Sequence, residues 1–375
     1  MTPFNNALAE DAPRNWPVTI MFALTFLIAV TLVPWYGFTV GFSGWAWMFF
    51  GLFLALNGIG IGSGYHRLWA HRAYKAHPAL AVFFAIFGGM AFQNSILIWS
   101  ARHRVHHRDV DDPENDPHSI KRGFWFAHIG WMTKDYVSGD VDFSVVPDLE
   151  RDPVVMWQHR WYLPITLATN IGLPMLFGWL VGDFLGVFLL AGVARLVANH
   201  HITFFINSLA HVWGSQPYTD ENTARDNWLI SLVTYGEGYH NFHHMFQHDY
   251  RNGIRWWHFD FNKWVIATCS WAGLAKDLKR APRFKILRAK LNMDFKRARQ
   301  RLADAQQDRH WLETLENEYQ EFMETVKKWQ ALQVHKVQQS RQALTSGFNT
   351  RFRELEFSLK MQRKRLALLT AQLSV

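Results

Sequence analysis

Residues 15–65 contain no Asp, Glu, Lys or Arg. A helix needs about 20 mainly apolar residues to cross the hydrocarbon of a bilayer, and this run divides into two stretches of that length, 16–38 and 42–63. A second pair follows at 162–180 and 184–206, separated by Gly182 and Asp183. We therefore predict an all-α membrane protein with four transmembrane helices.

The loops inside the two pairs of predicted spans are poor in basic residues, whereas arginines occur on the outer flanks: Arg14, Arg67, Arg72, Arg160 and Arg251. Positively charged flanks normally stay in the cytoplasm, so we expect both termini there. Arg195 lies within the fourth predicted span, where an ionisable group usually faces a protein interior or a polar cavity.

The stretch 79–98 is apolar enough to suggest a fifth span. Crossing the membrane there would place the first two histidine clusters described below on opposite faces. We therefore expect this stretch at the interface or in the domain core.

The character of the sequence changes after residue 280. We predict a membrane domain over 1–280 and a basic helical extension over 281–375. In the extension, apolar residues recur at spacings of three and four in two series, which Ser346 and Gly347 separate. This pattern indicates a helical hairpin or coiled coil. A solvated amphipathic appendage is the simpler interpretation, and a partner-binding role is the alternative.

Eight histidines occur in three clusters: His66 and His71, then His103, His106 and His107, then His240, His243 and His244. Each HxxHH cluster places its rings on one helical face, within about 100° of arc. His66 and His71 are about 140° apart on an ideal helix, so one of them is expected where a helix frays or ends.

This inventory of imidazoles predicts metal binding. Imidazole suits iron, copper, nickel and zinc, and a single tetrahedral zinc is filled by four ligands. If these imidazoles were buried without a metal, each ring nitrogen left without a hydrogen-bond partner would destabilise the fold by roughly 1 to 3 kcal/mol. Two metal ions are therefore the economical hypothesis.

The chain resembles the integral-membrane fatty acid desaturases, and within them the acyl-CoA delta-9, or stearoyl-CoA-type, branch in a bacterial-like form. The resemblance covers about 52–275 and rests on the segments 64–75 (GYHRLWAHRAYK), 92–94 (FQN), 116–118 (DPH), 122–124 (RGF), 130–131 (GW), 207–211 (NSLAH) and 236–244 (GEGYHNFHH).

This resemblance implies a cytoplasmic helical cap holding a di-iron centre, with two Fe²⁺ ions bound by the eight histidines and a ninth, His211. It also implies that Asn207 acts through a water. Such enzymes use O₂ and two external electrons to introduce a cis double bond, here expected at the delta-9 position of a saturated acyl chain. We expect the bacterial inner membrane as the location, with the active site in the cytoplasm.

The resemblance also implies a substrate tunnel, with its bend beside Gln93, Trp99 and Thr203. Trp99 and Thr203 acting as ordinary packing residues is the alternative. At the blind end of the tunnel, Leu54 and Gly58 replace the aromatic and the small residue of animal enzymes. We expect Leu54 and Gly58 to help set the chain length.

The acyl carrier is left open. Ala101 and the run Lys134-Asp135-Tyr136 stand where animal enzymes hold the CoA phosphates with basic residues. Four other basic residues could replace these: Arg102, Arg104, Lys121 and Arg122. We expect acyl-CoA, with acyl carrier protein or a phospholipid as the alternatives.

Two carboxylates beside the ligand motifs, Asp116 and Glu237, are expected to orient ligand imidazoles through their second ring nitrogen. The acidic run of Asp109, Asp111, Asp112 and Glu114 is expected to form a solvated loop. His200 and His201 match no ligand position of the family and are expected to be structural or polar residues near the site.

Cys269 is the only cysteine, which excludes an iron–sulfur cluster held by the chain's own thiolates. The sequence also contains no His-Pro-Gly-Gly haem signature. We therefore expect a separate electron donor such as a ferredoxin, a rubredoxin or a cytochrome with its reductase, and no nucleic-acid partner.

Two other functions fit the histidine pattern. An alkane or sterol-type di-iron hydroxylase shares it, although the segments 207–211 and 236–244 favour a desaturase. A metal-binding membrane transporter or scaffold is the non-enzymatic alternative, which would have its ligands within the spans. The donor, the chain length and the oligomeric state stay open at this point.

Overall fold

The computed structural model describes residues 12–304, 309–338 and 346–372. The chain forms two compact units. The larger unit comprises the residues up to Ser215 together with Asn222–Arg280, and the smaller one comprises Gln216–Glu221 and the residues from Ala281 onward. Each unit is described by itself.

Four helical segments of the larger unit are long and apolar enough to cross a membrane: Trp16–Thr39, Gly44–Ala70, Tyr162–Leu180 and Phe184–Val212. The prediction of a helical protein with four transmembrane segments is therefore confirmed. Many apolar side chains of the first span are exposed, including Leu24, Leu27 and Trp35, as expected for side chains that face lipid.

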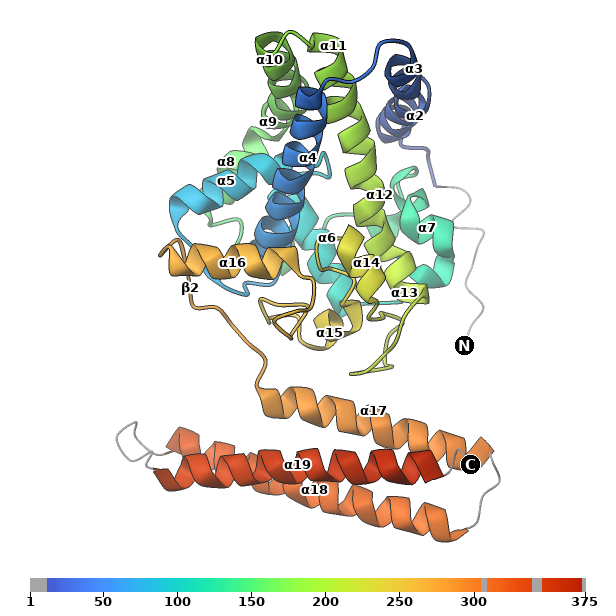
Figure 1. The fold of residues 1–375 in the computed structure, drawn as a ribbon, viewed down its shortest axis with the longest axis vertical. Coiled ribbons are helices and arrows are strands. Elements are labelled where there is room, and N and C mark those ends of the chain that lie inside the picture. Colours follow the sequence, from blue (N-terminus) through green and yellow to red (C-terminus); the bar gives the residue numbers. More distant parts are fainter. Residues whose placement is uncertain (1–11, 305–308, 339–345, 373–375) are drawn as a thin grey trace. The chain divides into compact units, whose positions relative to one another are not determined.

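Each span is built from shorter helical pieces (Figure 1). The first contains α2 (Trp16–Val30) and α3 (Leu32–Thr39), and the second contains α4 (Gly44–Ile59) and a π-helix, η1 (Gly60–Ala70). The third consists of α9 (Tyr162–Leu167), η6 (Ala168–Gly172) and α10 (Leu173–Leu180). The fourth consists of α11 (Phe184–Val187), η7 (Phe188–Ala194), α12 (Arg195–Asn207) and α13 (Leu209–Val212). The second and fourth spans thus continue past 63 and 206, the ends expected from hydropathy.

Arg195 lies in the protein interior and is fully buried. Its guanidinium donates to the carbonyl oxygens of Ala191 and Met90 and to Oδ1 of Asn170. These acceptors replace water around a cation at membrane depth, which agrees with the expectation that Arg195 faces the protein.

The rest of the larger unit forms a helical cap at one end of the spans (Figure 1). Its helices are α5 (Pro78–Gly89), α6 (Ile96–Arg108), α7 (Phe124–His128), α8 (Pro153–Arg160), α14 (Trp228–Val233), α15 (His240–Met245) and α16 (Phe261–Trp271). Four 3₁₀ turns follow α6: η2 (Ile120–Arg122), η3 (Gly130–Met132), η4 (Val137–Gly139) and η5 (Phe143–Val145). Two short antiparallel strands, β1 (Lys75–Ala76) and β2 (Ala275–Lys276), join the start of the cap to its end.

The apolar stretch 79–98 does not form a fifth span. It contains α5, a turn and the first residues of α6, and α5 packs against η1. A Cβ atom on Gly60 would lie 2.3 Å from the backbone nitrogen of Gly88, and one on Gly88 would lie 2.3 Å from the Tyr65 ring. Glycine at both positions therefore lets the two helices approach closely.

The smaller unit is a bundle of three helices, α17 (Arg283–Asp304), α18 (Arg309–Gln338) and α19 (Ser346–Gln372). Its core contains Phe284, Leu291, Phe322 and Leu359, and the rings of Phe284 and Trp329 stack 3.9 Å apart. The predicted hairpin corresponds to α18 and α19. The prediction missed a third helix, because α17 also packs its apolar side chains into the core of the bundle. Leu373, the last residue of the second predicted apolar series, lies outside the described residues.

Candidate metal centre

Nine histidines converge at the end of the spans in two groups. One group has five members and the other has four, and within each group one ligand nitrogen per residue lies within 4.8 Å of every other. The first group is His66, His71, His103, His107 and His243, and the second is His106, His211, His240 and His244. All nine residues are those expected from the motifs and the resemblance.

Each HxxHH helix serves both groups. His103 and His107 of α6 belong to the five-histidine group, whereas His106 belongs to the four-histidine group. On α15 the division is reversed, because His243 belongs to the first group and His240 and His244 to the second. The two short helices therefore link the groups into one centre.

The ring nitrogens face one another at hydrogen-bond distance. The Nε2 atoms of His71 and His103 are 2.8 Å apart, those of His66 and His243 are 3.0 Å apart, and those of His240 and His211 are 3.2 Å apart. Several Nε2 atoms thus converge on each of two points. Neutral imidazoles that present their lone pairs in this way suit transition-metal ions such as iron, copper, nickel or zinc.

The π-helix η1 brings His66 and His71 together. The backbone N–H of His71, the residue that caps η1, donates to the carbonyl of His66 at 3.0 Å. This i→i−5 bond is the π-helical pattern, and the two ring centroids lie 4.7 Å apart. The expectation that one residue lies at a helix end is met by His71. The two rings converge because the helix is wider than an ideal α-helix.

Burial keeps six imidazoles of the centre neutral. The pKa of each of six histidines lies well below 6.5, because burial and then the neighbouring imidazoles disfavour the cation: His71, His103, His107, His240, His243 and His244. Neutral rings have a free lone pair at neutral pH, and that is the form which binds a metal ion.

Glu237 lies behind His66. Its carboxylate is 3.1 Å from Nδ1 of His66 and accepts hydrogen bonds from Arg67 at 2.8 Å and Asn252 at 2.6 Å. Burial by itself raises the pKa of Glu237, but Arg67 and His66 outweigh it and lower that pKa to about 2. The ionised carboxylate can therefore hold the proton of His66 on Nδ1 and leave Nε2 free.

Asp116 has the same relation to His106 in the other group. Its Oδ1 lies 2.9 Å from Nδ1 of His106, and its carboxylate also accepts the backbone N–H groups of Asp111 and His118. Burial raises the pKa of Asp116, but His106 and then His118 lower it below its ordinary value. Both predicted carboxylates thus lie where they can orient a ligand ring.

The sequence did not predict a third contact of this kind, in which an oxygen atom lies at Nδ1 of a histidine of the centre. Nδ1 of His211 is 2.8 Å from Oγ1 of Thr223, and that hydroxyl donates to Asp111 at 2.7 Å. The prediction that Asp111 belongs to a solvated loop is therefore wrong, because its carboxylate is largely buried and holds the Thr223 hydroxyl. The acidic run gave no signal of this, since Thr223 is far away in the sequence.

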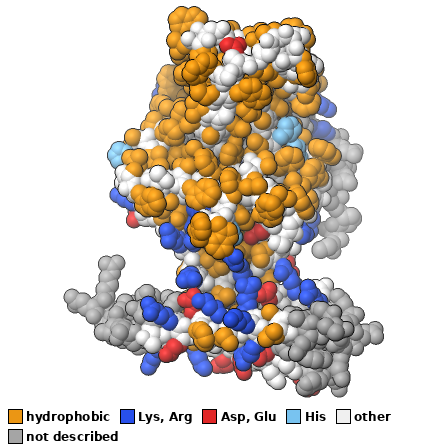
Figure 2. Space-filling view, viewed as in Figure 1, with side chains coloured by type: hydrophobic (Ala, Val, Ile, Leu, Met, Phe, Trp, Pro, Cys, Tyr) orange, Lys and Arg blue, Asp and Glu red, His pale blue; other side chains and the backbone are white. Residues whose placement is uncertain are grey.

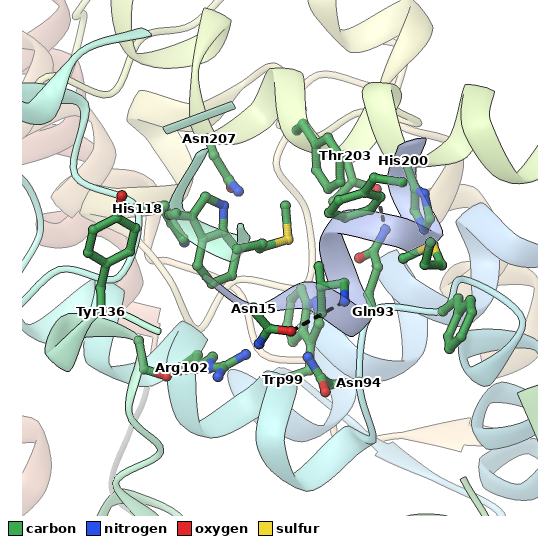
Figure 3. Close-up of a pocket in the computed structure, with 18 of the residues that line it drawn as sticks. Asn15, Gln93, Asn94, Trp99, Arg102, His118, Tyr136, His200, Thr203 and Asn207 are labelled. Atoms are coloured by element: carbon green, nitrogen blue, oxygen red, sulfur yellow. Dashed lines mark hydrogen bonds between the residues drawn. The ribbon is translucent and has the colours of Figure 1, made fainter. Parts of the chain in front are cut away.

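A cavity of about 400 Å³ adjoins the centre (Figure 3). Its lining includes three residues expected at the tunnel bend, Gln93, Trp99 and Thr203, and also Asn207. The Gln93 amide donates to the Thr203 hydroxyl at 3.0 Å. Trp99 stacks on His103 with 4.8 Å between ring centroids, and His103 itself lines the cavity.

Leu54 and Gly58, expected at the blind end of the tunnel, are not among the described lining residues of this cavity. A Cβ atom on Gly58 would lie 2.6 Å from the Tyr235 ring, and the Tyr235 hydroxyl donates to the Leu54 carbonyl at 3.1 Å. The Tyr235 side chain therefore packs against Gly58 and is hydrogen-bonded to the backbone at Leu54.

The four basic residues expected to hold a carrier differ in their surroundings. Arg102 lines the cavity, Lys121 is exposed, and the Arg122 guanidinium lies over the rings of Phe126 and Tyr136. Arg104 does not fit that role. Its five N–H donors are all used, by the carboxylate of Asp148 and the carbonyls of Trp69, Ala70 and Val145.

His118 is a cavity residue to which the motifs assigned no role. Its ring is buried and lies 4.2 Å from that of His106, between centroids. The DPH segment, residues 116–118, was the sequence feature that could have identified His118 as a residue of the site. His200 donates its Nε2–H to the Ala91 carbonyl at 2.9 Å, and His201 contacts His128 at 3.0 Å. Neither His200 nor His201 belongs to the two groups.

Two linked histidine groups beside a cavity, at one end of four membrane-spanning helices, define a helical membrane protein with a candidate metal site. Residues 43–276 match the family described as fatty acid desaturase. Because this match covers more than half of the chain, the chain belongs to the fatty acid desaturase family.

Curated relatives agree with this assignment. A probable acyl-CoA desaturase of Schizosaccharomyces pombe is 49% identical over 232 residues, which are 62% of this chain and 48% of the relative. An sn-2 palmitoyl-lipid 9-desaturase of Nostoc is 34% identical over 292 residues, 75% of this chain and 98% of the relative. Human stearoyl-CoA desaturase is 37% identical over 283 residues, 73% of this chain and 76% of the relative. The chain spans about half the length of the fungal relatives it matches.

Proposed function

We propose that the chain is a membrane-bound di-iron fatty acyl desaturase. The observation that carries this proposal is the position of His103, which belongs to the five-histidine group and also lines the cavity beside Trp99. A methylene pair held in that cavity lies next to the metal centre. When two Fe²⁺ ions are bound, they supply the reduction of O₂ that removes two hydrogens from adjacent carbons.

The nine histidines of the two groups are proposed as the iron ligands, with Asn207 contributing through a water to the four-histidine group. Asn207 and His211 are four residues apart at the end of the fourth span, which favours a shared face. Glu237, Asp116 and the Asp111–Thr223 pair hold the Nδ1 protons of His66, His106 and His211. These contacts fix which nitrogen of each ring faces the metal.

The cavity residues are proposed to position the substrate. The hydrogen bond between Gln93 and Thr203 joins the cap to the fourth span, and Trp99 covers His103. Such a wall can bend an acyl chain and keep water away from its methylenes. Orientation and a dry site, instead of acid–base side chains, then select the bond to be oxidised.

We propose a saturated acyl chain as the substrate, with the cis double bond at the delta-9 position. The names of the relatives support two carriers, since fungal and mammalian relatives are acyl-CoA or stearoyl-CoA desaturases and the Nostoc relative acts on a palmitoyl lipid. Acyl-CoA is our first choice, because Arg102 and Lys134 line the cavity and can contact phosphates.

Lipid analysis of cells that express the chain tests this proposal. Mass spectrometry should find acyl chains lighter by two hydrogens, with the double bond at the ninth carbon, and pulse labelling should identify the carrier on which the product first appears. A gain of one oxygen would indicate the hydroxylase alternative. Iron binding without any product would indicate a metal-binding scaffold.

The chain-length proposal for Leu54 and Gly58 is kept, although the described cavity lining includes neither residue and the Tyr235 ring covers Gly58. A long acyl chain could reach Gly58 only if the Tyr235 side chain moves. We expect Leu54→Trp to shift the product toward shorter chains, and a product profile that stays unchanged across chain lengths would reject the role of this end.

Electron delivery is proposed to require a separate ferredoxin, rubredoxin or cytochrome. The centre is proposed to face the cytoplasm of a bacterial cell, with the spans in the inner membrane. The arginines on the outer flanks of the spans support this orientation.

A further inference from the structure

Helix α19 has an exposed apolar stripe. Phe357, Met361 and Leu368 are 64%, 41% and 67% exposed, and their spacings of four and seven place them on one side of the helix. The opposite side carries Leu359 and Leu366, which are buried in the bundle core. In the described part of residues 281–375, the exposed large hydrophobic side chains all lie on α19.

Cations flank this stripe. Arg353, Lys360 and Lys364 are exposed and lie on the same side of the helix as the stripe. Across its length, α19 contains six Lys or Arg residues and two Glu residues. One of these, Glu356, contacts Lys360 at 3.5 Å and Arg283 at 3.7 Å. We call the surface formed by Arg353, Phe357, Lys360, Met361, Lys364 and Leu368 the basic–apolar face.

A basic groove lies between α19 and α17. It has a volume of about 260 Å³, and its lining includes Arg297, Arg301 and Arg363. Asp294 is the only carboxylate among the described lining residues, and Arg363 binds it at 3.0 Å. Three guanidinium groups around one hollow suit an anionic phosphate group. Figure 2 shows Lys and Arg side chains among hydrophobic ones on the visible face of the bundle.

We propose that the basic–apolar face docks on the anionic headgroups of the membrane in which the chain is anchored. An amphipathic helix with exposed Phe and Leu beside cations is typical of membrane-surface binding. Each Lys or Arg near an anionic leaflet contributes about 1 kcal/mol, so this small face binds weakly by itself. Weak binding suffices here because the four spans already hold the chain at the membrane, which makes docking an intramolecular event.

The connection between the units supports this assignment. Helix α16 and the loop before it expose tryptophans, with Trp256 80% and Trp271 88% exposed, and exposed Trp is typical of the membrane interface. Eleven residues, 272–282, connect Trp271 to the start of α17 at Arg283. The smaller unit is therefore tethered by a short linker to a segment of interfacial character.

Two other occupants fit less well. A second copy of α19, paired in antiparallel or parallel fashion, would bring the same cations of both helices together. A soluble acidic protein would have only three apolar side chains and a few cations to bind, whereas specific interfaces bury about 1,200 to 2,000 Å². The bilayer needs neither a large area nor shape complementarity.

The test uses the full chain in which Cys269 is replaced by Ser and Leu368 by Cys, so that a polarity-sensitive dye can be attached at position 368. The labelled protein is reconstituted into phosphatidylcholine vesicles with and without phosphatidylglycerol. We expect a blue shift of the dye emission only in the anionic vesicles, and we expect salt to reverse it. A dye at position 324 of α18, after Glu324→Cys, should show no such shift.

Charge variants separate the possible occupants. Replacing Arg353, Lys360 and Lys364 by Gln should abolish the shift, whereas Lys327→Gln with Lys328→Gln on α18 should leave it. A shift that occurs equally in phosphatidylcholine alone and grows with protein density would assign the face to a second copy and overturn the proposal. No shift in any vesicle would overturn it as well.

Discussion

At the scale of single residues, the centre depends on what lies behind each imidazole. His66, His106 and His211 each have an oxygen acceptor at Nδ1, supplied by Glu237, Asp116 and Thr223 respectively. An imidazole whose Nδ1 donates in this way presents the Nε2 lone pair to a metal ion. The acceptors thus decide which ring nitrogen faces the metal.

Replacing Asp116 by Asn should weaken iron binding at the four-histidine group. The amide is uncharged and can present its NH₂ group to Nδ1, so His106 loses the partner that fixes its proton. We expect a roughly 10- to 100-fold loss of metal affinity, measured by competition with a chelator. Asp112→Asn is the matched control, because the Asp112 carboxylate accepts from Glu114 and Asn115 of its own loop and contacts no ligand ring in the described hydrogen bonds. Equal losses in both variants would contradict the role of Asp116.

Thr223 gives a second test at this scale. Thr223→Val removes the hydroxyl between His211 and Asp111 and keeps the shape, so we expect roughly tenfold weaker metal binding. Thr223→Ser keeps the hydroxyl and should restore the affinity. If valine and serine behave alike, the hydroxyl has no part in positioning His211.

The HxxxxH and HxxHH motifs identified eight histidines of the two groups, since they are local patterns, and the family resemblance supplied the ninth, His211. They could not identify Asp111, because its acidic neighbours resemble a surface loop and its partner Thr223 lies on another part of the chain. They also assigned a carrier role to Arg104, whose donors are used inside the cap. Long-range contacts of this kind leave no local signal.

At the scale of elements, the π-helix η1 is the feature that periodicity did not predict. Apolar periodicity assumes the α-helical pattern, and i→i−5 bonding persists only where tertiary contacts support it. Here Tyr65 packs on Gly88, and the Tyr74 hydroxyl donates to the Ser63 carbonyl at 2.7 Å. In α17 the buried residues Phe284, Leu291, Phe295 and Leu302 recur at intervals of four and seven. Many Lys and Arg residues lie between them, so this third helix of the bundle was not predicted.

Gly62→Ala tests whether η1 needs its close contacts. A Cβ atom at position 62 would lie 2.1 Å from the Asn262 side chain, and overpacking of this kind costs about 1 to 3 kcal/mol. We expect a lower thermal unfolding temperature in detergent and weaker iron binding through His66. Gly51→Ala in the same span has no heavy atom within 4 Å of its Cβ and should change neither quantity.

At the scale of the whole molecule, the centre couples the stability of the larger unit to pH. Six histidines of the two groups are neutral in the folded state, with pKa values well below the 6.5 expected in an unfolded chain. Below pH 6.5 the unfolded chain binds more protons than the folded one, so the free energy of unfolding falls as the pH falls toward the folded-state pKa values.

We therefore expect metal-free protein to lose thermal stability steadily as the pH is lowered from 7.5 to 5. Metal-loaded protein should keep its stability over more of this range, because bound iron competes with protons for the same nitrogens. Thermal unfolding of both forms in detergent measures the difference. Stability that is independent of pH in the metal-free form would mean that these imidazoles are not buried as described.

The membrane architecture followed from the sequence because span length and apolar composition are direct physical requirements of the bilayer. Which histidine of α6 and of α15 belongs to which group did not follow from it, since this division depends on how four distant segments meet. That shared arrangement is also the central claim about this protein.

Mössbauer spectroscopy of the purified full chain, loaded anaerobically with enriched ferrous iron, tests this claim most directly. The account predicts two irons per chain in two distinguishable sites, one with five histidine ligands and one with four, and His211→Ala should alter the signal of the second site more than that of the first. A single iron per chain, or two identical sites unaffected by His211→Ala, would contradict it.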